Sequence, residues 1–193
     1  MATKRHKVFI SFHHGDKKID PKCGEYWKER FEKLFHDQFE TIISRSVQDG
    51  DIQEGILTET TRRKIRDNYI AEATVTVVLI GPETWKRKHV DWEISSSLRD
   101  TKKNSRCGLI GIMLPTYKGY NKITETYDPF TIPPRLFENE LCGFASIYLW
   151  NENPFIVQNW IHEAFLRRDK LIPVNSFPLF RNNRAFNQTN WQY

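Results

Sequence analysis

One apolar run in the middle of the chain constrains the fold most. Residues 75–81 have the sequence Val-Thr-Val-Val-Leu-Ile-Gly, and Pro82 follows directly. A short run that is rich in β-branched residues and closed by Gly-Pro is typical of a strand buried on both faces, as in the interior of a parallel sheet. The rest of the chain must therefore supply helices that cover both faces of such a sheet.

Apolar runs and amphipathic segments alternate along the chain, as a parallel sheet requires. Predicted strands cover residues 7–12, 41–43, 75–81, 108–115 and 143–150, and predicted helices cover residues 25–36, 56–70, 89–98 and 154–165. Right-handed crossover connections place the helices on both sides of such a sheet. The sequence therefore predicts an α/β fold with a five-stranded parallel sheet and helices on both faces.

Two regions lack this regularity. Residues 116–140 are rich in Gly, Asn, Asp and Pro, and we expect a long loop there, which in a compact domain is often functional. The tail after Leu171 is also irregular, and its Asn- and Gln-rich end from Arg181 is expected to be loosely ordered. No linker or internal repeat divides the chain. We expect one domain over residues 1–170 and a C-terminal extension over residues 171–193 that packs on the domain or trails from it.

Composition and net charge limit the classes of ligand that we expect the protein to bind. A hydrophobic share of 39% among 193 residues predicts a packed globule. Lys and Arg together exceed Asp and Glu by 29 − 24 = 5, which favours anionic ligands. The chain has no stripe of Lys and Arg long enough to indicate nucleic-acid binding, so no nucleic-acid partner is expected.

Cysteines and apolar runs bear on cellular location. The three cysteines are widely spaced and form no Cys-x-x-Cys pair, which argues against a disulfide framework or a zinc site. The N-terminus has no signal-peptide apolar region, and the apolar runs are too short to cross a bilayer. We therefore expect a soluble cytoplasmic protein without a metal site or a membrane partner.

Several nucleotide-binding classes are excluded by their missing motifs. No Gly-x-Gly-x-x-Gly turn follows the first strand, and the chain contains no Walker phosphate loop, so neither a Rossmann oxidoreductase nor a P-loop NTPase is supported. A response-regulator receiver would need an aspartate at the end of the third strand, where this chain has Ile80-Gly81-Pro82. The function must come from another site on the sheet.

One carboxylate stands where parallel sheets bind ligands. Glu93 lies beside the apolar stripe of the helix over residues 89–98, close to the carboxyl end of the strand over residues 75–81. Ligands bind in the crevice beyond the carboxyl ends of such strands. We expect Glu93 to be partly exposed there and to be kept ionised by the amino end of its helix. Spacing alone leaves two interpretations open, namely a catalytic carboxylate and a structural Glu that complements the helix dipole.

Three segments together resemble a known family. They are Val8-Phe-Ile-Ser-Phe-His13, the polar loop over residues 44–55, and Leu79-Ile-Gly-Pro-Glu-Thr-Trp85 leading to Trp92-Glu93-Ile94. Over residues 6–165 the chain resembles a TIR domain and, more narrowly, the TIR-like proteins of bacterial Thoeris anti-phage systems. The resemblance implies a flavodoxin-like sheet and glutamate-dependent cleavage of the nicotinamide–ribose bond of NAD+. Such members release a cyclised or conjugated ADP-ribose as a second messenger, which a separate effector protein reads.

The resemblance also implies roles for individual residues. Glu93 corresponds to the catalytic glutamate, and the loop over residues 44–55 corresponds to one that packs against a neighbouring protomer, which implies self-association. Many bacterial members have Trp four residues before the glutamate, whereas this chain has His89 there. The first-strand loop, which lines the substrate pocket in the family, corresponds to Phe12, His13, His14 and Asp16. From the chemistry of their side chains we also expect Trp85 to stack on a ring of the substrate and Arg45 to contact a phosphate, with His89 in the pocket wall. Ordinary alternatives stay open: the two adjacent histidines as loop residues, the tryptophan as packing and Arg45 as a solvated cation.

The implied reaction needs few protein groups. Nicotinamide is a good cationic leaving group, so cleavage develops oxocarbenium character on the ribose without protonation of the leaving group. One carboxylate that faces this charge stabilises the transition state. NAD+ is then a substrate, and no cofactor is expected. Two other functions stay open: a non-catalytic TIR-type interaction module, and a nucleoside ribosyltransferase, which also sets a glutamate in a flavodoxin-like fold.

Overall fold

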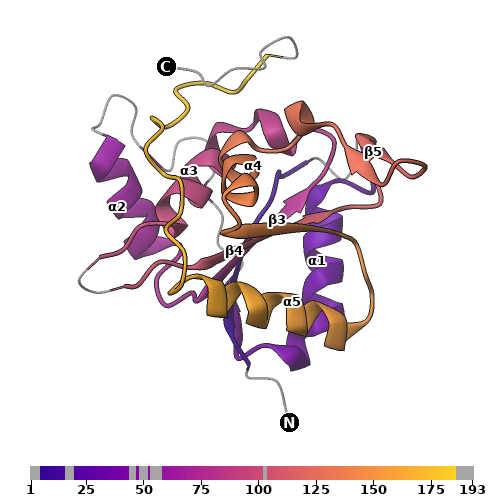
Figure 1. Ribbon diagram of the computed structural model, residues 1–193, viewed down its shortest axis with the longest axis horizontal. Helices are drawn as coiled ribbons and strands as arrows, with labels where there is room; N and C mark the ends of the chain where they lie inside the picture. The colour runs from indigo at the N-terminus through magenta and orange to yellow at the C-terminus, as the bar shows by residue number, and fades with distance from the viewer. Residues whose placement is uncertain are drawn as a thin grey trace.

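A five-stranded, all-parallel sheet forms the centre of the protein (Figure 1). The structure is a computed structural model that describes residues 5–15, 20–43, 47, 52, 58–101 and 104–185. The strands of the sheet are β1 (Lys7–Ser11), β2 (Thr41–Ile43), β3 (Val75–Ile80), β4 (Gly108–Met113) and β7 (Ala145–Leu149), in the order β2-β1-β3-β4-β7. This is the flavodoxin-like order, and it confirms the predicted fold class.

Helices cover both faces of the sheet. Helices α1 (Gly24–Phe35) and α5 (Pro154–Arg167) pack on one face, and α2 (Thr58–Asn68), α3 (Lys88–Ser97) and α4 (Pro134–Leu141) pack on the other. Within the described residues there are also three short 3-10 turns, η1 (His36–Gln38), η2 (Thr84–Lys86) and η3 (Pro129–Thr131). In the part of the chain that the structure describes, no helix is long and apolar enough to cross a membrane.

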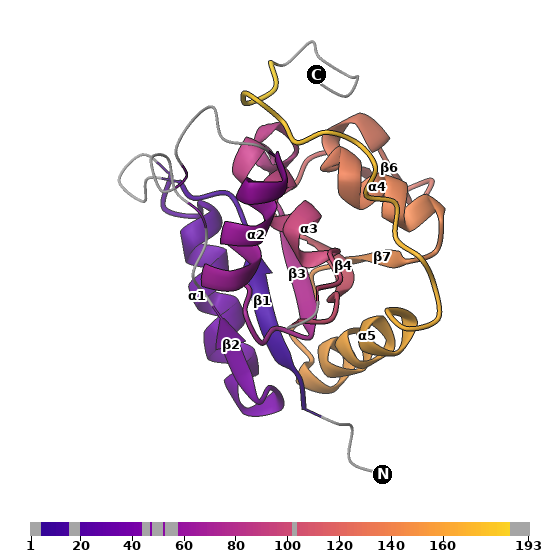
Figure 2. The same cartoon turned by 90° about the vertical axis from the view of Figure 1, so that its left-hand side faces the viewer.

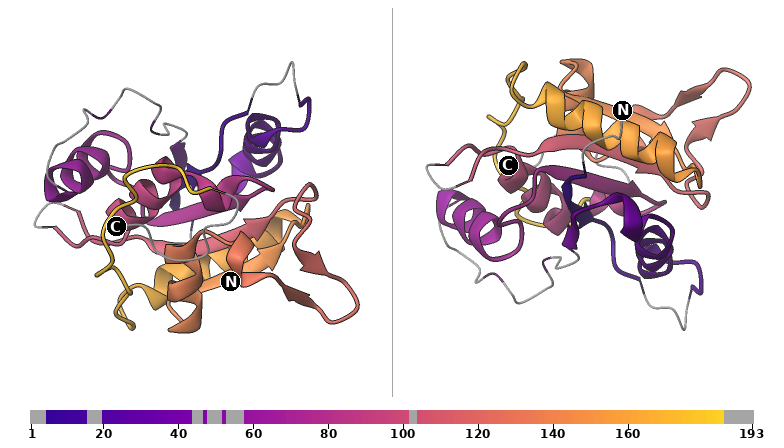
Figure 3. Two further views of the ribbon diagram at one scale, coloured as in Figure 1. Left: turned by 90° about the horizontal axis from the view of Figure 1, so that it is seen from above. Right: turned by 90° about the horizontal axis from the view of Figure 1, so that it is seen from below.

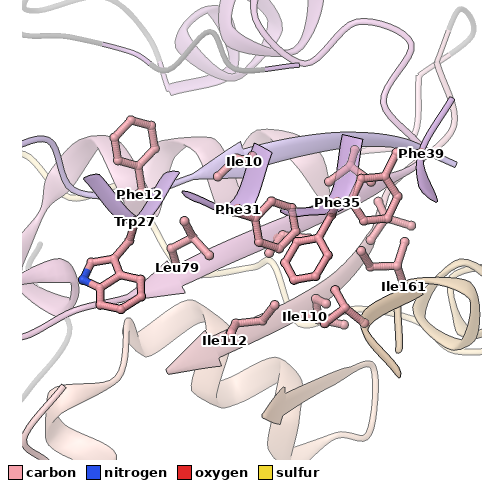
Figure 4. Close-up of a cluster of buried hydrophobic side chains, with 14 of the residues drawn as sticks. Ile10, Phe12, Trp27, Phe31, Phe35, Phe39, Leu79, Ile110, Ile112 and Ile161 are labelled. Atoms are coloured by element: carbon pink, nitrogen blue, oxygen red, sulfur yellow. The ribbon is translucent and has the colours of Figure 1, made fainter. Parts of the chain in front are cut away.

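The central strand divides the core into two sides. Along β3, Val77 and Leu79 pack toward α1 and α5, whereas Val78 and Ile80 pack toward α3 and α4. All six residues of β3 are buried, as expected for an interior strand of a parallel sheet. Figure 4 shows the first side, where the rings of Phe31 and Phe35 from α1 lie near Ile110 and Ile112 of β4. Each such side chain stabilises the fold by about 1.5–3 kcal/mol through its burial.

The expectation of a long loop over residues 116–140 is wrong. This region contains a two-stranded hairpin, β5 (Tyr120–Asn121) with β6 (Thr126–Tyr127), which projects from the body of the molecule (Figure 3), and the helix α4. Helix α4 has only eight residues and begins at Pro134, directly after Pro133. A helix this short offers two turns of periodicity, and Pro-Pro is also a loop signal, so the sequence pattern concealed it.

The C-terminal segment is better ordered than its composition indicates. Residues 171–185, here called the strap, run back from α5 over α4 and α3 (Figure 2). Phe180 is 1% exposed and Arg184 is buried, so the expected loose order from Arg181 onward is wrong for residues 181–185. The remaining residues of the predicted extension, 186–193, lie outside the described residues.

Polar contacts bind the strap to three helices. Arg62 on α2 donates to the Phe177 carbonyl at 3.0 Å, and Trp92 Nε1 on α3 donates to the Phe180 carbonyl at 2.7 Å. On α4, Asn139 Nδ2 donates to the Val174 carbonyl at 2.8 Å. The strap therefore joins α3, the helix that carries Glu93, to both of its neighbours on this face of the sheet.

Candidate active site

The Glu93 side chain lies at the carboxyl end of the first strand. Glu93 belongs to α3, and its Oε2 accepts a hydrogen bond from Ser11 Oγ, at the end of β1, at 2.6 Å. Its Oε1 accepts a hydrogen bond from the Val47 backbone N–H at 2.7 Å. The carboxyl group is thus held from both sides by groups far away in the sequence.

The structure corrects the expected environment of Glu93. The residue is 1% exposed, not partly exposed. Burial raises the pKa of Glu93 to about 8, although the hydrogen bonds from Ser11 and Val47 act in the opposite direction. Glu93 is the sixth residue of α3, beyond the first turn where the helix dipole acts most strongly, so the helix end does not offset the burial. In this state the carboxyl group is mostly protonated at pH 7.

A cleft of about 340 Å³ lies next to this carboxyl group. We call it the site cleft, and it is lined by Phe12, His13, His14, Val47, Arg87, His89, Val90 and Asn183. Val47 lines the site cleft and its backbone N–H donates to Glu93, so this residue contacts both, whereas Glu93 itself is not part of the cleft lining. Because Glu93 is 1% exposed, a ligand in the site cleft contacts it only after groups that bury it, Val47 among them, have moved.

The structure brings together most of the site residues predicted from sequence. Phe12, His13, His14 and His89 all line the site cleft. The ring of Phe12 lies 4.3 Å from that of His14, and His89 packs edge-on against Trp92 at 5.2 Å between centroids.

Three other sequence-predicted positions do not line the site cleft or lie outside the description. Trp85 is 5% exposed and packs beneath the Arg184 guanidinium at 5.2 Å, which is a packing role. Asp16 and Arg45 lie outside the described residues, as does the loop over residues 44–55 apart from Val47 and Ile52.

The charges around the site cleft are unevenly distributed. Burial lowers the pKa of His13 to about 4, with a further contribution from the positive charge of Arg87, so this imidazole is neutral at pH 7. His14 Nδ1 lies 3.1 Å from Glu25 Oε2. Arg87 lines the cleft just before the first residue of α3 and places a positive charge there, which suits the phosphates of a nucleotide.

Sequence patterns missed four residues of the site. Ser11 could have been found, because it is a polar residue at the carboxyl end of a predicted strand, where ligands of parallel sheets bind. Arg87 lies between the predicted strand and helix and carried no signal beyond its charge. Val47 and Asn183 come from irregular segments, and no local pattern brings them to Glu93 or to the site cleft.

Fold and site together define a class of protein. The strand order is flavodoxin-like, which is consistent with a TIR-type domain, and a glutamate on α3 is held near a cleft at the carboxyl edge of the sheet. The family model of the Thoeris protein ThsB, TIR-like domain, matches residues 9–119, more than half of the chain. The chain therefore belongs to the Thoeris ThsB TIR-like family, and this membership supports a role in anti-phage defence. A search of curated proteins found none that matches the chain.

The raised pKa of Glu93 leads to a pH-dependent stability difference. The pKa is about 8 in the folded protein and near 4.5 in the unfolded chain, so the stability linked to this group is present below pH 4.5 and is lost as the pH rises to 8. Glu93→Gln cannot ionise, so its free energy of unfolding should rise relative to that of the wild type over this range, by on the order of 5 kcal/mol at pH 9. Urea denaturation of both proteins at pH 5 and pH 9 measures this difference. Equal wild-type and variant stabilities at both pH values would contradict the burial of a neutral carboxyl group.

Proposed function

We propose that this protein cleaves the nicotinamide–ribose bond of NAD+ and converts the ADP-ribose part into a second messenger for anti-phage defence. The observation that carries the proposal is the Glu93 carboxyl group, fixed by Ser11 and Val47 beside the site cleft. Membership in the Thoeris ThsB TIR-like family supports the same function. NAD+ acts here as a substrate, and the proposed reaction uses no other cofactor.

The proposed reaction uses the charge of Glu93. The C–N bond to the ribose breaks, nicotinamide leaves with the bonding electrons as a neutral ring, and positive charge develops on the ribose carbon. The ionised Glu93 carboxylate faces this charge and stabilises it. A hydroxyl group of the substrate or a water molecule then forms the new bond to the ribose carbon and loses its proton to solvent.

Movement of the groups that bury Glu93, Val47 among them, would expose its carboxyl group and allow it to ionise. Burial is the largest cause of the raised pKa, so displacement of Val47 and entry of solvent or substrate would lower that pKa toward its ordinary value. The described arrangement, in which Glu93 is buried, therefore holds a neutral and inaccessible carboxyl group. An arrangement in which Val47 has moved away would present a charged carboxylate to the site cleft. This coupling would keep the resting protein from consuming NAD+.

Residues that line the site cleft are chemically suited to the other parts of NAD+. Phe12 and His89 offer ring faces and edges to the nicotinamide, and Arg87 offers a positive charge to the pyrophosphate. Asn183 reaches the same cleft from the strap, and its Oδ1 accepts a hydrogen bond from the Lys88 backbone N–H at 3.0 Å.

The alternative is a non-catalytic interaction module. It rests on the observation that Glu93 is 1% exposed and protonated in the described state. Incubation of the purified protein with NAD+ separates the two functions, because only an enzyme releases free nicotinamide. A nucleoside ribosyltransferase would consume nucleosides in a parallel incubation and spare NAD+.

Several accompanying properties stay predictions. Self-association through the TIR-like domain, a separate effector that reads the product, and a cytoplasmic location follow from the family resemblance and from composition. Light scattering of the purified protein over a range of concentrations tests the first of them.

A substitution at His89 is expected to change the product. His89 lines the site cleft where many family members have Trp, and a larger indole would narrow the path by which a nucleophile reaches the ribose carbon. His89→Trp should therefore alter the ratio of cyclised to hydrolysed ADP-ribose more than the rate of NAD+ loss. Mass spectrometry of the products measures the ratio, with the exposed His36→Trp as the control. An unchanged ratio would show that the His89 side chain has only a packing role.

A further inference from the structure

A second cleft shares His13 with the site cleft. It has a volume of about 240 Å³ and is lined by residues that follow β1, β3 and β4, among them Cys23, Gly81, Thr84 and Leu114. The chain passes from β1 outward to β2 and then returns to β3, so the gap between β1 and β3 is the point where the strand order reverses. Flavodoxin-like sheets bind ligands at this point.

The walls of the second cleft are suited to an uncharged ring. Leu79 and Leu114 supply apolar surface. The Thr84 hydroxyl is already engaged, since it accepts from the Gly81 N–H at 2.8 Å and donates to the Leu79 carbonyl at 3.3 Å. Glu83 is engaged as well, with Lys86 Nζ at 2.8 Å. The charged residues of the lining are Lys22, Asp20 and Glu83, so one positive charge stands against two negative ones. This balance disfavours a phosphate, whereas the apolar side chains offer contact area to a flat, uncharged heteroaromatic ring.

His13 connects the two clefts. Its side chain lines both of them, and no group in the described part of the chain hydrogen-bonds its ring. The neutral imidazole has one donor and one acceptor nitrogen, which match the alternating donors and acceptors on the edge of a purine. Helix α1 approaches the His13 backbone closely, because a Cβ at Gly24 would lie only 1.8 Å from the His13 carbonyl oxygen. The absence of a side chain at Gly24 thus lets α1 pack directly against His13, the residue that the two clefts share.

We propose that the second cleft binds the adenine ring of NAD+, with His13 hydrogen-bonding the edge of the ring. The proposal rests on the proposed function, which places the nicotinamide-bearing ribose carbon at Glu93 beside the site cleft. Adenine is the other ring of the same molecule and is uncharged. Because the two clefts meet at His13, one folded dinucleotide occupies both, and the adenosine end lies close to the reacting ribose, as cyclisation requires.

Gly81 offers a way to close the second cleft without disturbing the backbone. A Cβ at Gly81 would meet only Thr84 Oγ1 at 3.6 Å and Leu114 Cδ1 at 3.7 Å, which are ordinary contacts with cleft-lining atoms. Gly81→Leu therefore directs a side chain into the cleft, and Gly81→Ala is the matched variant that adds a single methyl group. Circular dichroism and the thermal midpoint establish that both variants are folded.

Titration with adenosine tests the proposal independently of catalysis. Adenosine carries no phosphate, so the positive net charge of the protein cannot attract it. We expect saturable binding of adenosine to the wild type and to Gly81→Ala by calorimetry, and at least tenfold weaker binding to Gly81→Leu. No saturable binding to the wild type, or equal binding by a folded Gly81→Leu variant, would overturn the proposal.

Turnover provides a second readout. Nicotinamide mononucleotide has the same scissile bond as NAD+ but no adenosine. The preference of the wild type for NAD+ over this substrate, expressed as the ratio of the two kcat/KM values, should fall at least tenfold in Gly81→Leu, and an unchanged ratio would overturn the adenine assignment. If the wild type cleaves neither substrate, the proposed function fails, and the adenosine titration alone then decides whether the second cleft is an adenine site.

Discussion

Arg135→Ala is expected to lower the free energy of unfolding by about 3–5 kcal/mol, the range for removing one partner of a buried ion pair. Arg135 is fully buried, and its Nε donates to Asp91 Oδ1 at 2.8 Å. Its Nη1 donates to Asn175 Oδ1 at 3.0 Å, and its Nη2 donates to the Pro178 carbonyl at 3.0 Å. The guanidinium group therefore links α4 to α3 and holds the strap in the same set of contacts.

Removal of Arg135 leaves a buried negative charge. Asp91 is 2% exposed and would keep only the Phe180 backbone N–H, at 3.1 Å, among these partners. Urea denaturation at neutral pH measures the loss. Arg30→Ala is the matched control, because it breaks an exposed ion pair with Glu152 and should leave the unfolding free energy nearly unchanged. A similar small effect for both variants would show that the strap and α4 do not support α3.

The largest effect on activity is expected from Glu93→Gln. The amide keeps the volume of the side chain and retains an oxygen that can accept a hydrogen bond, but it cannot carry the negative charge that faces the developing oxocarbenium. Loss of one well-placed catalytic group of this kind typically lowers the rate by about 10²–10⁴-fold. The rate of nicotinamide release per protein measures the effect at saturating NAD+.

A control separates loss of charge from loss of structure. Glu163 is exposed on α5 and lines neither cleft, so Glu163→Gln removes one negative charge outside both of them and should retain the wild-type rate. The fold of Glu93→Gln is checked by its denaturation curve, which should indicate at least wild-type stability at pH 9. Wild-type turnover by a folded Glu93→Gln protein would show that another group stabilises the transition state.

Most of the fold could be predicted from sequence because its signals are local. The runs over residues 75–80 and 108–113 are continuous and apolar, which predicts strands buried on both faces, and both are central strands of the sheet. The start of α5 was equally clear: the Asn153 side chain accepts from the Phe155 N–H at 3.0 Å, and Pro154 occupies the first helical position, as predicted.

The strap could not be predicted because its order comes from distant partners. Its residues show no periodicity, and backbone carbonyls such as those of Phe177 and Phe180 are satisfied by side chains of α2, α3 and α4. Asn175 exchanges two hydrogen bonds with Ser95, its Oδ1 accepting and its Nδ2 donating at 2.9 Å, across 80 positions of sequence. A composition rich in Asn indicates a loop but does not reveal which buried groups the loop completes.

The site shows the same division between local and distant signals. The position of Glu93 beside the apolar stripe of α3 was visible in the sequence and placed it near the carboxyl edge of the sheet. Its burial was not visible, because it depends on distant groups such as Val47, which donates to the carboxyl group from 46 positions earlier in the sequence. The protonation state follows from that cover and therefore could not be predicted either.

Release of nicotinamide from NAD+ tests the central claim most directly. NAD+ labelled in the nicotinamide ring is incubated with the purified wild-type protein, alone and in lysate from phage-infected cells. The free labelled nicotinamide and the ADP-ribose products are then separated, identified and quantified by mass spectrometry. The account predicts that labelled nicotinamide and an ADP-ribose derivative appear in equal amounts in at least one of these conditions. Intact NAD+ after prolonged incubation in both conditions would contradict NAD+ cleavage by this protein.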